Sequence, residues 1–214
     1  MSDEQAHWQS IYDNKEPDEQ TWYQREPAIS LELIEMARER GEYGETSRFI
    51  DVGAGASTLV DHLLEKGGHA ITLVDIAASA LETSRARLGD DADRVTWEVA
   101  DLREPLDLAG PFDIWHDRAV FHFLTDQAHR RQYRRNLEAL TGPGAHLVLS
   151  TFGPQGPDKC SGLPVRRYSA ASMSEEFGER WELVEERMED HPTPWGGEQQ
   201  FAYALFKRRR LRTP

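Results

Sequence analysis

The chain has 214 residues, and its 38 acidic side chains outnumber 25 basic ones to give a formal net charge of −13. A surface of this charge repels nucleic acid, so we expect no nucleic-acid partner. No apolar stretch reaches the roughly 20 residues that a membrane span needs. The single cysteine, Cys160, excludes an internal disulfide. The lack of disulfides and a polar, acidic N-terminus that does not resemble a secretory signal together favour a cytoplasmic protein.

The first 26 residues carry aromatic side chains among polar ones, namely Trp8, Tyr12, Trp22 and Tyr23. Aromatic residues in a polar segment have no core of their own, so we expect segment 1–26 to cover another part of the protein. The alternative is that they only fasten the segment to the domain. A helix is expected next, from Pro27 to Gly41, because proline suits a first helical turn, apolar residues recur at helical spacing, and glycine ends the pattern.

From residue 48 to residue 152 the sequence alternates short apolar runs with helix-like segments. The apolar runs predict strands at 48–52, 70–75, 94–101, 112–117 and 145–152, and the segments between them predict helices at 57–66, 77–88 and 126–140. Strands that are linked by helices must pair in parallel through right-handed crossovers. The alternation therefore predicts a doubly wound α/β sheet.

The C-terminal part has a different pattern. A loop at 153–167 and a short helix at 169–177 precede two strand-like runs, 180–189 and 199–208. The linker between these runs is too short for a crossover helix, so they predict an antiparallel hairpin. We expect one domain with seven strands, one of them antiparallel; its parts are a covering segment (1–26), a cofactor-binding core (27–152), a substrate loop with helix and hairpin (153–208), and a solvated basic tail (209–214).

The stretch RFIDVGAGAS, residues 48–57, brings a carboxylate and two glycines to the carboxyl end of the first strand. Doubly wound sheets bind ligands at this edge. Gly53 and Gly55 let a ligand approach the backbone closely, and the helix that follows turns free N–H groups towards the same place. A tight strand–helix turn without a ligand is the alternative interpretation of the glycines alone.

The next two strands also end in carboxylates. Asp75 lies twenty residues after Gly55, where it can accept hydrogen bonds from two ribose hydroxyls, and Asp101 with the Leu102 backbone N–H ends the third strand near an adenine edge. Together these strand ends predict an adenosine site built from Asp51, Gly53, Ala54, Gly55, Ser57, Asp75, Ile76, Asp101 and Leu102. The third glycine of the dinucleotide fingerprint is absent, which disfavours a nicotinamide dehydrogenase.

These motifs resemble those of the class I S-adenosylmethionine-dependent methyltransferases over nearly the whole chain. FIDVGAGAS is similar to their first motif, Asp75 to their ribose-binding acid, VADLR to their adenine-contacting segment and FDIWHDRAVFHFL to their fourth motif; Ser57 stands where the family often has glycine. The order of W…TW, IWHDRA and a proline-rich loop is similar to the thiopurine and thiol/halide methyltransferases. The N-terminal tryptophan and tyrosine pattern resembles protein lysine methyltransferases.

The resemblance implies a Rossmann-like methyltransferase fold, S-adenosylmethionine as the cofactor, and transfer of its methyl group to a small molecule. Protein lysine methylation is the alternative activity. A cofactor-fold protein that binds a partner without catalysis is a further alternative, although the glycine turn, Asp75 and Asp101 are all intact.

Methyl transfer is an in-line displacement, which needs an acceptor atom held close to the methyl group and needs a base only for a protonated acceptor. We expect Asp117 and Arg118, after the fourth strand, beside the methionine part of the cofactor, with Arg118 pairing with a carboxylate. A structural salt bridge is the alternative for Arg118. The candidate catalytic residues are Asp117 and His122. His122 would accept a proton from the acceptor; the alternative is that it is a core histidine. His116 is a weaker candidate, because strand alternation directs it away from Asp117.

The loop 153–167 and the hairpin tip 190–199 are expected to form the rim of the acceptor site, since loops at this edge usually bind substrate. The rim candidates are Cys160, Arg166, Tyr168, His191 and Trp195. Trp8, Trp22 and Tyr23 are expected to lie over the cofactor, where their rings would exclude water and attract the sulfonium cation. No CxxC or HxxxH spacing is present, so we expect no metal site.

Overall fold

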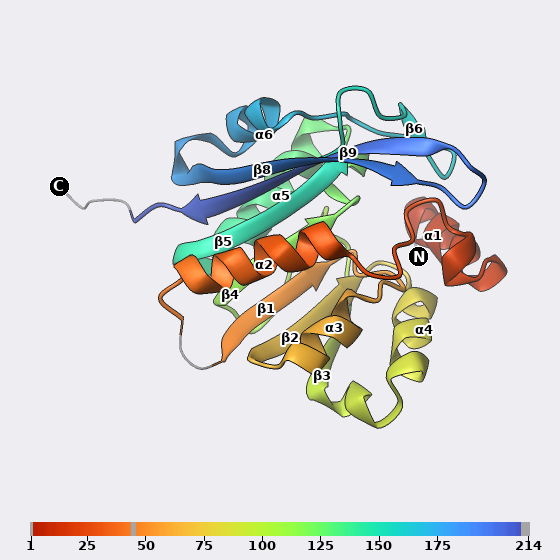
Figure 1. The fold of residues 1–214 in the computed structure, drawn as a ribbon, viewed down its shortest axis with the longest axis horizontal. Coiled ribbons are helices and arrows are strands. Elements are labelled where there is room, and N and C mark those ends of the chain that lie inside the picture. Colours follow the sequence, from red (N-terminus) through yellow and green to blue (C-terminus); the bar gives the residue numbers. More distant parts are fainter. Residues whose placement is uncertain (1, 44–45, 211–214) are drawn as a thin grey trace.

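A seven-stranded sheet runs through the protein, and we describe it from a computed structural model that defines residues 2–43 and 46–210. The strand order is β3-β2-β1-β4-β5-β9-β8 (Figure 1). The strands are β1 (Ser47–Val52), β2 (His69–Asp75), β3 (Val95–Val99), β4 (Phe112–Arg118), β5 (Thr141–Phe152), β8 (Trp181–Pro192) and β9 (Glu198–Arg208). The last four residues of the predicted basic tail lie outside the described residues.

The direction of the strands confirms the predicted fold class. The pairs β1–β2, β1–β4, β2–β3 and β4–β5 are parallel, whereas β9 runs antiparallel to both of its neighbours, β5 and β8. One strand of seven is therefore antiparallel, and the C-terminal hairpin extends the sheet beyond β5. The carboxyl ends of β1 to β4 lie at one edge, which places the predicted ligand residues together.

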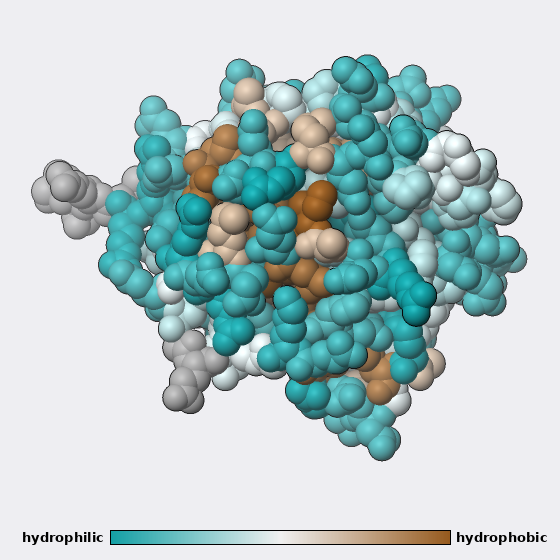
Figure 2. Space-filling view, in the orientation of Figure 1, coloured by the Kyte–Doolittle hydropathy of each residue, from teal (hydrophilic) through white to brown (hydrophobic). Residues whose placement is uncertain are grey.

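Helices cover both faces of the sheet because successive strand residues point to opposite sides. Phe49 packs with α2 (Ala28–Arg40), α3 (Leu59–Lys66) and α4 (Ala78–Leu88) on one face. Ile50 and Val52 pack with α5 (Gln127–Leu140) and α6 (Ala170–Phe177) on the other. Figure 2 shows hydrophilic side chains over most of the face that carries α2 and α3. Among the described residues, no helix has the length and apolar character to cross a bilayer.

A helix in the covering segment and a short sheet in the loop after β5 were not predicted. The covering segment begins with a helix, α1 (Asp3–Asn14), which lies beside α4 (Figure 1) and contains no buried residue. A helix without a buried stripe gives no apolar periodicity, which explains why the pattern did not indicate it. The loop after β5 contains a short two-stranded sheet of β6 (Lys159–Cys160) and β7 (Leu163–Pro164). Both elements lie against the ligand edge of the main sheet, where they shape the cavity described next.

Candidate active site

The carboxyl ends of β1, β2, β3 and β4 open onto a cavity of about 320 Å³, within the size range of small-molecule sites. Its wall combines the segments that follow these strands with residues of the N-terminal segment and of the β6–β7 loop. The predicted cofactor residues along it are Asp51, Gly53, Ala54, Gly55, Ser57, Asp75, Ile76, Asp101, Leu102, Arg118, Trp22 and Tyr23. Only Asp117 of the predicted cofactor set lies away from it.

The glycine turn after β1 has the left-handed backbone that favours glycine, with φ of +65° at Gly53 and +56° at Gly55. Neither position has room for a side chain. A Cβ atom on Gly53 would collide with the side chain of Val120, and one on Gly55 would collide with the hydroxyl of Tyr12. The turn therefore keeps the backbone N–H groups of residues 53–57 close to the cavity.

Asp75, at the end of β2, holds this turn in place. Its carboxylate accepts hydrogen bonds from the backbone N–H of Gly55 and of Ala77, each at 2.8 Å. Burial raises the pKa of Asp75 to about 6, and the nearby charge of Asp51 acts in the same direction, against the two backbone hydrogen bonds. Each carboxylate oxygen can accept more than one hydrogen bond, so both retain capacity for ribose hydroxyls.

Asp51 takes part in a buried chain that ties α2 to the sheet. Nδ1 of His116 lies 2.7 Å from Oδ1 of Asp51, and Nε2 of the same ring lies 2.9 Å from the hydroxyl of Ser30. His116 is thus occupied on both ring nitrogens and orients the carboxylate that borders the cavity. This arrangement agrees with the expectation that His116 points away from Asp117.

The segment after β3 contains a residue that the sequence analysis missed. Arg103 contacts the carboxylate of Asp101 through Nε at 2.9 Å and Nη2 at 2.6 Å, and it also pairs with Glu4 on α1. Burial acts to raise the pKa of Asp101, but the hydrogen bonds and charge of Arg103 hold it below its usual value. The expected adenine end therefore carries an ion pair that fastens the covering segment. Arg103 is part of the VADLR motif, but its contact with Asp101 depends on the bend of the backbone after β3, which the sequence pattern does not indicate.

Asp117 does not border the cavity, which corrects its prediction as a catalytic and cofactor-binding residue. It is fully buried, and its carboxylate accepts backbone hydrogen bonds from Val120 at 3.1 Å and Phe121 at 3.2 Å. Strand alternation sends His116 to the α2 face and so sends Asp117 to the α5 face. The carboxylate instead stabilises the turn after β4, in which Ala119 has a φ of +66°.

His122 is also a core residue and not a proton acceptor in the cavity, which corrects the second catalytic prediction. Its ring is completely buried, and Nδ1 accepts a hydrogen bond of 3.1 Å from the backbone N–H of Phe152. Burial, followed by the charge of Arg118, lowers the pKa of His122 to about 3. The ring is therefore neutral at physiological pH and fixes the loop between β4 and α5.

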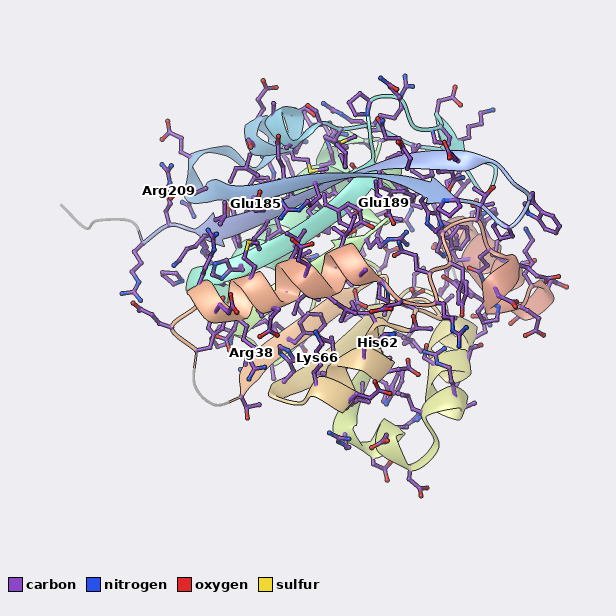
Figure 3. All side chains as sticks on the ribbon, in the orientation of Figure 1. Arg38, His62, Lys66, Glu185, Glu189 and Arg209 are labelled. Carbon is purple, nitrogen blue, oxygen red and sulfur yellow. The ribbon has the colours of Figure 1, made fainter. Side chains whose placement is uncertain are left out.

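Arg118 borders the cavity and links three parts of the protein. Its Nη1 donates to the carbonyl oxygen of Trp22 at 2.7 Å, its Nε donates to the hydroxyl of Tyr203 at 3.0 Å, and its guanidinium lies 4.7 Å from the ring centroid of Phe201. Tyr203 in turn donates a hydrogen bond of 2.7 Å to Glu189 on β8 (labelled in Figure 3). Within residues 2–43 and 46–210, the solvent-shielded Nη2 has no hydrogen-bond partner.

The N-terminal segment closes the cavity through aromatic contacts. Trp8 packs edge-on against Phe123 with ring centroids 4.9 Å apart, and against Trp22 at 6.0 Å. Gln24 fastens the end of the segment by donating to Glu189 at 2.7 Å. The segment therefore lies over the cavity and is attached to the hairpin on its far side.

Four of the five predicted rim residues do not border the cavity. Cys160 does, and burial raises the pKa of its thiol to about 11. Arg166 is exposed beside the ring of Tyr168, which is itself buried in the core, while His191 is buried near Glu189 and Trp195 is 76% exposed. The β6–β7 segment contributes Cys160, Leu163 and Pro164 to the cavity wall.

The described residues contain no group of three or more His, Cys, Asp or Glu side chains that could hold a metal ion. Cavity residues that the sequence analysis did not assign to the site include Gln20, Arg103, Phe123, His129, Leu163 and Pro164. Tyr12, which it noted only as an aromatic of the covering segment, also lines the cavity.

Residues 50–147 match a family model described as a methyltransferase domain. The chain is 27% identical over 130 residues to 2-heptyl-1-hydroxyquinolin-4(1H)-one methyltransferase of Mycobacteroides abscessus, an alignment that covers 60% of this chain and 53% of the relative. The chain thus spans about half the length of the curated relatives it matches.

Solved structures share the fold over a larger part of the chain. An S-adenosylmethionine-dependent methyltransferase from Anabaena variabilis superimposes with a TM-score of 0.73 at 15% identity, covering 96% of this chain and 93% of that one. The 1,6-didemethyltoxoflavin-N1-methyltransferase of Burkholderia thailandensis, crystallised with 1,6-didemethyltoxoflavin and S-adenosylhomocysteine, has a TM-score of 0.65 at 21% identity, with 87% and 80% coverage.

Proposed function

Residues 50–147 belong to a family of methyltransferase domains in a chain with the class I S-adenosylmethionine-dependent methyltransferase fold, and from this premise we propose that the protein methylates a small molecule with S-adenosylmethionine. The observation that carries the proposal is the meeting of three strand ends in one covered cavity. The glycine turn after β1, Asp75 after β2, and Asp101 with Leu102 after β3 all border it.

The side chains along the cavity fit an adenosyl amino acid. Leu102 offers an apolar surface for the adenine ring, and Asp75 retains acceptor capacity for the ribose hydroxyls. A Cβ at Gly53 or Gly55 would collide with Val120 or Tyr12, so glycine at both positions lets these two side chains pack against the turn. The free Nη2 of Arg118 supplies a charged donor for the carboxylate at the amino-acid end.

The chain's own residues provide positioning and exclusion of water. When bound, S-adenosylmethionine would supply a sulfonium methyl group that is open to in-line displacement by an acceptor's lone pair, with S-adenosylhomocysteine as the leaving group. The covering segment shields this space through Trp8 and Trp22, with Trp8 packed against Phe123, so that solvent does not compete with the acceptor. The predicted bases, Asp117 and His122, lie outside the cavity wall, whereas His129 borders it.

The shape and lining of the cavity favour a small acceptor over a protein lysine. Aromatic side chains of the covering segment lie across the opening, and Leu163 with Pro164 adds apolar surface beside Cys160. A lysine substrate would need an open groove for its peptide backbone. The curated relative described above is a methyltransferase of 2-heptyl-1-hydroxyquinolin-4(1H)-one, which supports the same class of acceptor. The narrower resemblance to thiopurine and thiol/halide methyltransferases stays a prediction.

The proposed function is tested by thermal melting with S-adenosylhomocysteine, S-adenosylmethionine and NAD. A ligand present at 100 times its dissociation constant adds about 2.7 kcal/mol of stability, so both adenosyl compounds are expected to raise the Tm by several degrees. A rise with NAD alone would overturn the proposal. Transfer of a labelled methyl group to panels of sulfur, nitrogen and oxygen acceptors would then identify the acceptor atom.

Replacing Trp22 with alanine is expected to lower turnover about tenfold while the protein still folds, because the ring closes the cavity but packs only at the margin of the core. Steady-state kinetics together with thermal melting measure the two effects. Trp195→Ala is the matched control: this tryptophan is 76% exposed at the hairpin tip, and its loss should change neither quantity. Unaltered kinetics in Trp22→Ala would rule out the covering role.

A further inference from the structure

The hydroxyl group of Tyr12 lies directly above the glycine turn. Tyr12 is on the last turns of α1, and its oxygen occupies the space that a Cβ of Gly55 would need. The side chain borders the cavity, so the surface it leaves accessible faces the ligand space. The absence of a side chain at residue 55 therefore leaves room for the phenol of Tyr12.

The groups around this hydroxyl come from both halves of the cavity. Burial raises the pKa of Tyr12 far above its usual value, and the charges of Asp75 and then Cys160 act in the same direction, while a hydrogen bond with the Trp22 side chain opposes them. Asp75 is also hydrogen-bonded to the backbone of Gly55 at 2.8 Å. The phenol therefore keeps its proton. Asp75, Cys160 and Trp22 border the same cavity as Tyr12.

This position corresponds to the reactive part of the proposed cofactor. In the proposed binding mode the adenine end would lie at Asp101 and Leu102, the ribose at Asp75 and the amino-acid end at Arg118, all of which border the cavity. The sulfur, which joins ribose and amino acid, would then pass the glycine turn. The hydroxyl of Tyr12 lies at this turn, above Gly55.

We propose that Tyr12 contacts the positively charged sulfonium methyl group and makes the protein bind S-adenosylmethionine in preference to S-adenosylhomocysteine. The inference rests on the proposed function, because it concerns the same cofactor. A neutral phenol oxygen presents lone pairs to the cation and to its polarised C–H bonds, interactions that the uncharged product cannot make. Tyr12 would then favour release of the product after each turnover.

The test compares dissociation constants of S-adenosylmethionine and S-adenosylhomocysteine, measured by calorimetry on wild type and Tyr12→Phe. Loss of the hydroxyl is expected to weaken S-adenosylmethionine about three- to fivefold and S-adenosylhomocysteine less than about twofold. Tyr12→Leu should show the same selective loss. The control is Tyr43→Phe, which removes a hydroxyl that donates to Asp113 at 3.0 Å, outside the cavity wall, and should leave both constants unchanged.

Other outcomes would overturn the inference in distinguishable ways. Equal weakening of both ligands would make Tyr12 a structural residue, and unchanged constants would exclude a contact. Tighter binding of both ligands would mean that the hydroxyl occupies space that the cofactor needs. If wild type binds neither ligand, the proposed function fails and this inference fails with it. Thermal melting of each unliganded variant checks that it is folded.

Discussion

Asp75→Ala is expected to weaken binding of S-adenosylhomocysteine by about 100-fold or more, because two hydrogen bonds to a charged carboxylate are lost together. The same change removes the acceptor for the backbone N–H groups of Gly55 and Ala77. Leaving both groups buried without a partner should also lower the free energy of unfolding by about 2 to 4 kcal/mol. Calorimetric titration at a temperature well below the Tm of the variant measures the affinity, and urea unfolding measures the stability.

The pH dependence of the wild-type affinity provides an independent measurement of the same role. Because burial raises the pKa of Asp75 to about 6, the carboxylate takes up a proton as the pH falls through that value and loses acceptor capacity. The dissociation constant of S-adenosylhomocysteine should therefore rise as the pH falls below 6, approaching about tenfold per pH unit. A flat profile between pH 7 and pH 5, or wild-type affinity in Asp75→Ala, would remove Asp75 from the ribose site.

Asp117→Ala is expected to lower the free energy of unfolding by a similar amount, about 2 to 4 kcal/mol, but to leave cofactor affinity nearly unchanged in the molecules that remain folded. Asp117 also accepts two backbone hydrogen bonds, from Val120 and Phe121, yet it lies outside the cavity wall. The two buried aspartates thus form a matched pair in which only Asp75 faces the ligand. The same titration and unfolding experiments on both variants measure the contrast.

A pH series separates the structural role of Asp117 from a catalytic one. Burial raises the pKa of Asp117 from 3.8 to about 7, so the folded protein holds a proton that the unfolded chain releases between these values. The stability contributed by this group is therefore complete below about pH 4 and falls as the pH rises towards 7. Asp117→Asn should flatten that part of the stability profile. Abolished methyl transfer in a stable, cofactor-binding Asp117→Asn would instead restore the catalytic interpretation.

Much of the fold could be predicted from the sequence because strand and helix periods are local properties of the chain. Apolar runs such as FIDV and AITLVD, separated by helix-like segments, indicated a parallel sheet, and the short linker before QQFAYALFKR indicated the hairpin. Helix α1 was missed because it buries no residue and so lacks an apolar stripe. The β6–β7 turn was missed because strands of two residues are too short to show a period.

The sequence by itself determined the ligand edge of this protein. In a parallel sheet the carboxyl ends of the strands share one edge, so finding Asp51, Asp75 and Asp101 at three consecutive strand ends was sufficient to bring them together. Only the tertiary structure decided which side chains beyond those ends face the cavity. Asp117, Arg166 and Trp195 turn away, whereas Arg103 and Tyr12 turn in. The physical reason is that a side chain after a strand is directed by the backbone turn that follows and by packing partners distant in the chain, which no local pattern encodes.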